Sequence, residues 1–299
     1  MASRWPRFRR HGAASTALAC LSAWACQQPR PAARNHVRPA VSEVTPPLTI
    51  QRLGPGGCAL SDAGIWLCPS ADATPDNGCP VEQRAPQEPP PAVGDGLRCS
   101  LREGIVACRG NNPEGGLGDG HTRKSNDPVR VRLLGRAAQL AVGSQHACAL
   151  LGDGSVWCWG ENSRGAVGVG ELPACCDIPD PARPSEYLMP QRVVNLPASV
   201  AVVARGQASC ALTHRGDVYC WGENGSGELG IPPTGQPLAR PTRLLNMPAI
   251  KQLVMDLPSC ALGVDGQAYC WGDACPLRKQ STLPLKVDWA ELARRKSPG

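Results

Sequence analysis

The stretch that decides the fold is Cys148-Ala-Leu-Leu-Gly-Asp-Gly-Ser-Val-Trp-Cys-Trp-Gly160. The dipeptide Asp153-Gly154 within it suits a tight hairpin turn, because glycine tolerates positive φ. Folding the segment there places Cys148 opposite Cys158 and Leu150 opposite Val156. Directly opposed residues of an antiparallel pair lie roughly 4.5 to 5.5 Å apart at Cα, a span that a disulfide bridges. The segment is therefore predicted to be a β-hairpin that can staple itself.

The same pattern occurs five times, and three copies end in Cys-Trp-Gly, at Trp159, Trp221 and Trp271. The first cysteines of the copies lie 41, 49, 62 and 50 residues apart. Such a period is typical of one supersecondary unit per repeat. The predicted disulfide pairs are Cys58 with Cys68, Cys99 with Cys108, Cys148 with Cys158, Cys210 with Cys220, and Cys260 with Cys270.

Two further strand signals flank each hairpin. A segment of small and apolar residues precedes it, as at residues 140–143 and 202–206, and indicates an inner strand. A Pro-x-basic-aliphatic segment follows, at residues 128–131, 190–193, 241–244 and 284–287. Proline is tolerated at the start of a strand or on an edge strand. Four strands per repeat make the blade of a β-propeller, so the expected fold class is all-β, a β-propeller of about five four-stranded blades with disulfide-stapled hairpins.

The residues from Val142 to Leu150, those from Gly152 to Asn162, and the stretch from Gly222 to Gly230 resemble the repeat of the regulator of chromosome condensation family. The resemblance covers about residues 47 to 290. It is strong for the repeats that start near residues 140 and 200, shortened for the one ending at Trp271, and eroded in the first two, where tryptophan is missing from the Cys-Trp-Gly position.

The resemblance implies a β-propeller, usually of seven blades, so five visible repeats are a departure. Either the ring is five-bladed, or it is shortened or completed by something else. The final segment Pro284-Leu-Lys-Val-Asp-Trp289 supplies an outer strand with no hairpin after it. We expect this strand to join the blade begun at the N-terminus and to close a ring of five.

Gly-rich loops follow three of the hairpins, at residues 110–118, 160–168 and 222–230. A phosphate cradle is one interpretation of such a loop. The loops lack the Lys-Ser/Thr of a P-loop, and no helix is expected after them. A structural turn is favoured, and no cofactor is expected.

The N-terminus has the order of a secretory signal. Four arginines precede an apolar run from Ala13 to Ala25, which ends in Ala23-Trp24-Ala25, an Ala-x-Ala cleavage site. The run is too short to span a bilayer, which needs about 20 residues. Residues 1–25 are predicted to be a signal peptide, residues 26–46 a Pro-rich tether, residues 47–292 the propeller, and residues 293–299 a disordered tail.

Cys26 directly follows the expected cleavage site, which makes it a candidate for lipidation in a bacterial lipoprotein. The site is imperfect, because Ala23 stands where leucine is preferred and a bulky Trp24 precedes the last alanine. Lipidation of Cys26 would leave an even 14 cysteines of the 16 in the chain, which suits an oxidised exported protein. Plain secretion remains the alternative, so the expected location is the cell envelope or the medium.

Charge argues against nucleic acid as a partner. Removal of residues 1–25 takes away four arginines and lowers the net charge from +6 to +2. A DNA-binding propeller needs a clustered basic face. The remaining basic clusters, Arg123-Lys124, Arg278-Lys279 and Arg294-Arg295-Lys296, are predicted to be solvated loops and tail.

Four further cysteines, Cys79, Cys175, Cys176 and Cys275, lie between the hairpins. A four-thiolate zinc site is one interpretation, but the set contains no Cys-x-x-Cys pair, and adjacent cysteines rarely both bind one tetrahedral ion. Loop disulfides are favoured in an exported protein, with three pairings open, and no metal is expected.

No catalytic motif is recognisable. The histidines of the mature chain are His36, His121, His146 and His214, and none lies in a motif with a nucleophile and an acid. His146 resembles the histidine of the family's Gly-x-x-His, and the other repeats hold Gly56, Leu97, Ala208 and Pro258 at that position. A structural role is therefore favoured for His146, and the chain is predicted not to be an enzyme.

The leading hypothesis is a non-catalytic exported scaffold that binds a protein or a polysaccharide through the loops between its blades. The longest insertion, from Glu171 to Tyr187, is the candidate contact loop, with a tolerated insertion as the equal alternative. The family resemblance implies a second hypothesis, guanine-nucleotide exchange on a small GTPase with chromatin binding. A third is a secreted propeller that inhibits an enzyme by covering its active site.

Overall fold

The computed structural model describes residues 50–53, 59–61, 66–67, 91–173, 184–256, 258–272 and 281–288. Within these residues all regular structure is β-strand, as the sequence predicted. Blade 1 consists of β1 (Ile50–Leu53), β2 (Ala59–Ser61) and β3 (Trp66–Leu67). Blade 2 consists of β4 (Ala92–Val93), β5 (Leu97–Arg102), β6 (Ile105–Gly110) and β7 (Ser125–Arg130).

The other three blades follow in sequence. Blade 3 consists of β8 (Ala137–Val142), β9 (His146–Leu151), β10 (Val156–Glu161) and β11 (Glu186–Arg192). Blade 4 consists of β12 (Ser199–Arg205), β13 (Ala208–Thr213), β14 (Val218–Gly222) and β15 (Leu238–Arg243). Blade 5 consists of β16 (Ile250–Val254), β17 (Ser259–Gly263), β18 (Ala268–Gly272) and β19 (Ser281–Lys286).

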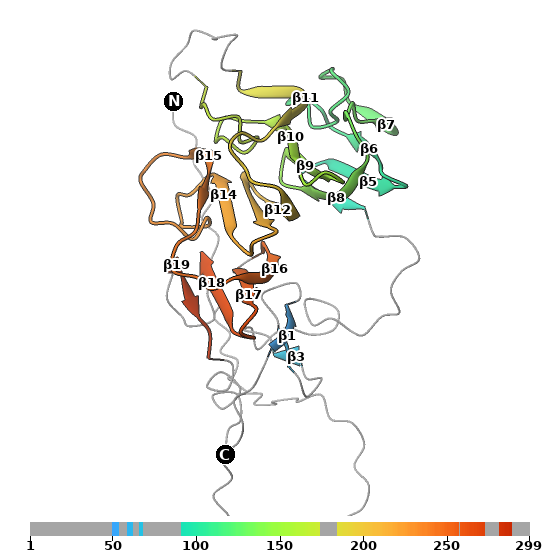
Figure 1. Cartoon of the computed structure of the whole chain (residues 1–299). Coiled ribbons are helices and arrows are strands. Elements are labelled where there is room, and N and C mark those ends of the chain that lie inside the picture. Colours follow the sequence, from blue (N-terminus) through green and yellow to red (C-terminus); the bar gives the residue numbers. More distant parts are fainter. Residues whose placement is uncertain are drawn as a thin grey trace, which may run out of the picture. The chain divides into compact units, whose positions relative to one another are not determined.

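Blades 2 to 5 are four-stranded antiparallel sheets in which each strand pairs with its neighbours in sequence, and blade 1 has three strands in its described part (Figure 1). The predicted β-propeller blade is therefore confirmed. The first three residues of each predicted Pro-x-basic-aliphatic segment end an outer strand, as Pro190 to Arg192 do in β11, and the aliphatic residue follows directly. A register shift occurs where each outer strand meets the hairpin, as between Cys158 and Gly160.

The central hairpin of each blade has the predicted register. Cys148 lies opposite Cys158, and Leu150 lies opposite Val156. Four of the predicted pairs are joined as disulfides, with Cα atoms 4.0 to 4.2 Å apart: Cys99–Cys108, Cys148–Cys158, Cys210–Cys220 and Cys260–Cys270. The predicted pair Cys58–Cys68 lies outside the described residues, as do Cys26, Cys79, Cys175, Cys176 and Cys275.

The core lies between the blades. We call the face of a sheet that is turned toward the next blade along the chain its front, and the opposite face its back. At the first such junction, Leu97 and Cys108 on the front of blade 2 pack with Ala149 and Trp159 on the back of blade 3. Cys158 and Trp221 meet in the same way between blades 3 and 4. Each described disulfide is thus part of a core between two blades. All eight cysteines of the four disulfides are at most 1% exposed.

A main-chain hydrogen bond crosses each described junction at the hairpin turn. The carbonyl of the turn glycine accepts from the first strand of the following blade, as Gly154 O does from Ser199 N at 2.8 Å. The other bonds are Ala137 N to Gly104 O at 2.9 Å, Ile250 N to Gly216 O at 2.9 Å, and Ile50 N to Gly266 O at 3.4 Å. The last of these joins blade 5 to blade 1, so the N-terminal blade follows the C-terminal one.

The expected role of the final strand is wrong. The strand around Pro284 does not join the N-terminal blade but pairs with β18 as the fourth strand of blade 5, with Leu285 opposite Cys270. Strands that follow one another in sequence usually pair, and β19 completes its own blade in the same way as β15 completes blade 4. Blade 1 meets blade 5 through β1 instead, since Ile50 and Leu53 pack with Cys260 and Leu262.

Candidate functional site

The tryptophan of Cys-Trp-Gly connects each blade to the one before it. Trp159 Nε1 donates to Gly116 O of blade 2 at 2.8 Å, and Trp221 Nε1 donates to Ala166 O of blade 3 at 2.8 Å. Trp271 Nε1 donates to Glu228 O of blade 4 at 2.9 Å. All three side chains are fully buried, so each tryptophan combines apolar burial with a satisfied donor. The sequence predicts that these tryptophans help to form the core, but not which carbonyls accept from them, because the acceptors lie 43 to 55 residues away.

The Gly-rich loops are the structures that receive the tryptophans. In each loop an asparagine side chain accepts from the main-chain N–H five residues later: Asn112 from Leu117 at 2.8 Å, Asn162 from Val167 at 3.0 Å, and Asn224 from Leu229 at 3.1 Å. The loop amides are thus used inside the loop, which supports the structural-turn interpretation. At Gly118, where φ is 65°, a Cβ atom would lie 2.8 Å from Trp159 Nε1, so the close approach requires glycine.

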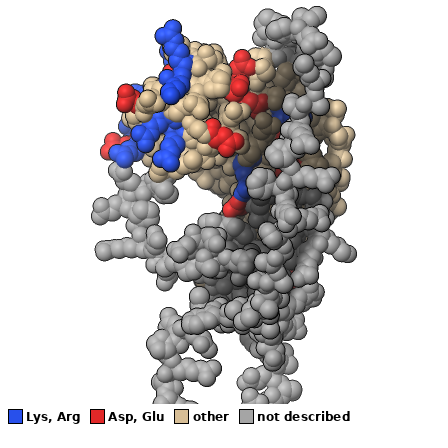
Figure 2. All heavy atoms as spheres, turned by 180° about the vertical axis from the view of Figure 1, so that it is seen from behind, with Lys and Arg blue, Asp and Glu red and all other residues tan. Residues whose placement is uncertain are grey.

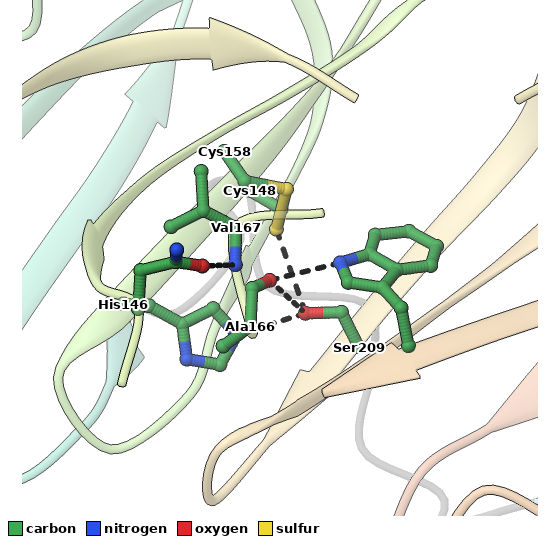
Figure 3. Close-up of a disulfide and its surroundings, with 8 residues drawn as sticks. His146, Cys148, Cys158, Ala166, Val167 and Ser209 are labelled. Atoms are coloured by element: carbon green, nitrogen blue, oxygen red, sulfur yellow. Dashed lines mark hydrogen bonds between the residues drawn. A yellow bond between two sulfur atoms is a disulfide. The ribbon is translucent and has the colours of Figure 1, made fainter. Parts of the chain in front are cut away.

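Among the histidines that the structure describes, His146 is the one that lies inside a core. Its Nε2 is 2.8 Å from Ser209 Oγ in blade 4, and Ser209 Oγ donates to Ala166 O at 3.3 Å. Figure 3 shows His146, Ser209 and Ala166 beside the Cys148–Cys158 disulfide. The Trp221 indole donates to the same carbonyl. Because the Ser209 hydroxyl donates to that carbonyl, it accepts from His146 Nε2–H, and Nδ1 carries no proton.

Burial lowers the pKa of His146 from 6.5 to about 4. Its Nδ1 is buried and has no hydrogen-bond partner among the described residues. A neutral imidazole and a serine hydroxyl at 2.8 Å have the distance of a catalytic pair, but both side chains are fully buried. The arrangement can hold blades 3 and 4 together, and it offers no surface on which a substrate could reach the serine.

The remaining histidines are dispersed. His121 and His214 are exposed in loops of blades 2 and 4, and His36 lies outside the described residues. No group of three or more His, Cys, Asp and Glu side chains that could hold a metal ion occurs in the part of the chain that the structure describes. In that part there is also no helix of the length and apolar character needed to cross a membrane.

The candidate contact loop is described only at its two ends, residues 171–173 and 184–187. Its last residues, Glu186 and Tyr187, begin β11. Burial raises the pKa of Tyr187, and the negative charge of Glu171 raises it further. The end of the insertion is fixed to the start of the Gly-rich loop of blade 3, because Asn162 N donates to Ser185 O at 2.7 Å.

A cavity of about 190 Å³ opens between blades 4 and 5, at the end of the blades that carries the Gly-rich loop. Met255 and Trp271 supply apolar lining. Charged side chains surround it: Arg205 of blade 4 is paired with Asp256 of blade 5, and Glu223 pairs at 3.2 Å with Arg164 of blade 3. A cavity with mixed charge and a small apolar floor can hold a side chain or short segment of a partner.

The loops at this end form a connected rim. Asp95 N of blade 2 donates to Ser144 O of blade 3 at 2.8 Å, and Ser144 N donates to Gly206 O of blade 4 at 2.8 Å. Gly206 lines the cavity, and Asp95 lines a second, smaller recess between blades 2 and 3. Because main-chain bonds fix one loop to the next, this rim is a preorganised surface for recognition.

Comparison with known proteins agrees with this architecture. The model of the regulator of chromosome condensation (RCC1) repeat matches residues 153–212, and a second model of that repeat matches residues 137–166 and 200–228. These ranges cover blade 3 and the first three strands of blade 4, where the predicted resemblance was strongest.

Curated relatives include the human probable E3 ubiquitin-protein ligase HERC6, 32% identical over 54% of this chain and 16% of that protein. The ultraviolet-B receptor UVR8 of Arabidopsis thaliana is 30% identical over 39% of this chain and 25% of that protein. The chain thus spans a quarter or less of the length of these relatives.

Two solved structures share the fold. Human WBSCR16 has a TM-score of 0.55 at 18% identity, over 71% of this chain and 55% of that one. Prp20p from Saccharomyces cerevisiae has a TM-score of 0.55 at 23% identity, over 77% of this chain and 60% of that one. The chain thus has the fold of a β-propeller, and its residues 137–228 match the regulator of chromosome condensation repeat.

Proposed function

We propose that this chain is an exported, non-catalytic β-propeller that binds a protein or a polysaccharide. The observation that carries the proposal is the placement of the disulfides: four of them lie in the cores between blades, with their cysteines at most 1% exposed. Cytosolic proteins keep such thiols reduced, whereas exported proteins oxidise them. A core built around four disulfides therefore supports folding in an oxidising compartment.

The proposed binding surface is the rim of loops with the cavity between blades 4 and 5. Its main-chain bonds limit the entropy cost of binding, and its cavity combines Trp271 and Met255 with charged groups. The insertion from Glu171 to Tyr187 follows the Gly-rich loop of blade 3, to which it is bonded through Ser185 O and Asn162 N, and it would extend this surface.

The proposal of a non-catalytic role rests on the burial of His146 and Ser209, the described residues that most resemble a catalytic pair. His146 and Ser209 are both inaccessible to solvent, and the low pKa of His146 comes from that burial. Neutral imidazole at the junction of two blades serves packing, because its single N–H is used by Ser209.

Export is tested by intact mass spectrometry of the protein from its native cells, before and after reduction and alkylation. A mature chain that starts at Cys26 with acyl groups and gains mass only after reduction would support an anchored, oxidised scaffold. A chain that starts near the same position without acyl groups would support free secretion. An uncleaved chain with free thiols would overturn export.

Binding is tested with the purified oxidised protein as bait for envelope extract, next to a variant in which a Gly-Ser linker replaces residues 174–183. Capture of the same protein or polysaccharide in replicate extracts, with loss of capture in the variant, supports the insertion as a contact. Retained capture assigns binding to the rim without the insertion. No specific capture by the wild-type protein contradicts the scaffold function.

Guanine-nucleotide exchange is the second candidate, and it rests on the shared fold. Prp20p, a yeast protein with this fold, is described with binding to Gsp1p and histones. At 23% identity the likeness shows the fold alone, so the exchange activity requires direct evidence. Free thiols and a cytosolic location in the experiment above would make nucleotide release from small GTPases the next assay.

A further inference from the structure

One core position is filled differently at three successive junctions between blades. Leu97, His146 and Ala208 lie at the same place in blades 2, 3 and 4, each opposite a glycine of the following strand. The side chains of Leu97 and His146 are large and buried, and they fill their junctions. Ala208 is buried too but has only a methyl group. The cavity of about 190 Å³ lies at this junction, between blades 4 and 5, and Ala208 lines it.

A serine of blade 5 faces this space. Ser259 holds the position that Ser209 holds in blade 4, because each lies opposite the tryptophan of Cys-Trp-Gly. Ser209 accepts from His146 Nε2 at 2.8 Å, and Figure 3 shows the two side chains. Ser259 lines the cavity and is 4% exposed, and its hydroxyl has no hydrogen-bond partner among the described residues. A buried hydroxyl in this state indicates a binding partner that enters the cavity.

The cavity also has a negative charge that the preceding junction lacks. Glu228 holds the position of Ala166, since the carbonyl of each accepts from the indole of the next blade. Glu228 Oε2 accepts from Ser226 N at 2.8 Å, and no cation pairs with this carboxylate in the part of the chain that the structure describes. The one arginine in the lining, Arg205, is already paired with Asp256. The cavity therefore offers an uncompensated negative charge.

This charge is a local property. The chain as a whole is basic, with a net charge of +6, or +2 without residues 1–25. Figure 2 shows a group of Lys and Arg side chains apart from several Asp and Glu side chains on the described surface, seen there from behind. A cation that binds the cavity is therefore attracted by the lining and not by the net charge of the chain.

We infer that the cavity between blades 4 and 5 binds a basic side chain, arginine or lysine, of a protein partner. The N–H groups of such a side chain can donate to Ser259 Oγ and to the carboxylate of Glu228, and its methylene groups can pack on Met255. The preceding junction shows that this position accepts a nitrogen donor against serine, since His146 is bound there by Ser209. A neutral side chain would leave the Glu228 carboxylate without a counter-charge.

This inference rests on the proposed binding function and names the chemistry of the partner. The two proposals can fail separately. If basic compounds bind the cavity but the pull-down captures nothing, the scaffold function fails and the site stands. If the pull-down captures a partner but basic compounds do not bind the cavity, the site fails and the scaffold function stands.

The probes are the N-acetyl amides of arginine, of lysine and of citrulline, which is the neutral isostere of arginine. Binding to the oxidised isotope-labelled protein is followed by NMR titration. We expect a dissociation constant on the order of a millimolar for the two basic amides, with shifts at the amides of Ser259 and Glu228. The citrulline amide should bind at least about tenfold more weakly, because a hydrogen bond to a charged group is lost.

Two variants restore what the other junctions have. Glu228→Ala introduces the residue of the preceding junction and should weaken binding of the arginine amide about tenfold. Its matched control, Asp127→Ala, removes the same charge at an exposed position of blade 2 and should stay within about twofold of the wild type. Ala208→His fills the cavity and should abolish binding. Melting curves check that this variant folds, and Glu228→Ala decides the test if it does not.

Several results would overturn the inference. Equal binding of the citrulline amide would show that charge is not recognised, and equal weakening in Asp127→Ala would assign the effect to net charge. Tighter binding of glucosamine than of the arginine amide would assign the cavity to a basic sugar. If the wild type bound no probe but Arg278→Ser with Lys279→Ser did, the occupant would be this chain's own basic segment. Absence of binding in both proteins would remove the site.

Discussion

The junction between blades 3 and 4 and the junction between blades 5 and 1 use the same strand positions with different chemistry. At the first, the Trp221 indole meets Ala166 O, and His146 meets Ser209 across the interface. At the second, the described hydrogen bonds are one main-chain bond from Ile50 and two bonds between the Gln252 amide and the main chain of Leu53.

The contacts that both junctions share indicate what holds neighbouring blades together. The contacts that differ indicate what a junction can lack. Both have a disulfide on the front of the earlier blade, at Cys148–Cys158 and at Cys260–Cys270, packed against apolar residues of the next blade. Only the first has a buried tryptophan with its donor satisfied among the described residues. The first repeat lacks the tryptophan of Cys-Trp-Gly. The junction between blades 5 and 1 is accordingly held by a disulfide, apolar packing and hydrogen bonds to the main chain.

Reduction breaks the disulfide that each of the two junctions contains, and it should lower the stability of the fold more than any of the substitutions below. Each hairpin disulfide closes a loop of about ten residues and stabilises by about 2 to 3 kcal/mol, so loss of all four exceeds the stability of many domains. We expect a fall of tens of degrees in melting temperature with reductant. Superimposable melting curves with and without reductant would contradict the prediction.

Removal of the tryptophan that distinguishes the junctions comes next. Trp221→Ala deletes a fully buried side chain and leaves Ala166 O without its indole donor, so we expect a loss of about 3 to 5 kcal/mol. The control is Trp157→Ala on blade 3, a partly exposed tryptophan that bonds only Ser155 on its own strand and should cost about 1 kcal/mol. Similar losses of the free energy of unfolding in the two variants, measured by urea denaturation, would show that Trp221 contributes no more to stability than the partly exposed Trp157.

The contrast between the two junctions also marks what a sequence can and cannot disclose. The pairing of Cys148 with Cys158 follows from a ten-residue separation about Gly154, because a hairpin is local. The partner of Trp221 is 55 residues away in another blade, and no local pattern specifies it. The expected path of the strand at Pro284 was wrong for a different reason, since the actual pairing is local: β19 pairs with β18 of its own blade.

The residues of the candidate site show the same difference between local contacts, which the sequence predicts, and distant ones, which it does not. His146 was predicted to be structural from its absence in other repeats, but Ser209 as its partner became visible only in the structure. The residues that replace the tryptophan in blade 2 can be identified from the sequence. Alignment of the repeats on their cysteines puts Arg98 and Arg109 where blade 3 has Ala147 and Trp159.

Acid should weaken the junction between blades 3 and 4 through His146. Its pKa is about 4 in the folded protein and near 6.5 when unfolded, so the unfolded chain binds the proton first as the pH falls. The free energy of unfolding should therefore be fully retained above pH 6.5 and fall by about 3 kcal/mol as the pH falls to about 4. Denaturation of His146→Gln should lose this dependence, whereas exposed His214→Gln should keep it; an unchanged profile in His146→Gln would refute the assignment.

The smallest expected effect tests the junction between blades 5 and 1. Gln252 donates to Leu53 O at 3.0 Å and accepts from Leu53 N at 2.9 Å, while Gln139 accepts one bond, from Val202 N at 2.9 Å. Gln252→Ala should cost about 1 to 2 kcal/mol and Gln139→Ala about half of that, because each lost bond contributes about 0.5 to 1.5 kcal/mol. Hydrogen exchange locates the loss: in Gln252→Ala, faster exchange should appear in β1 while β12 stays protected, since Trp221 still holds its junction. If β12 opened as readily as β1, the tryptophan would not be what separates the two junctions.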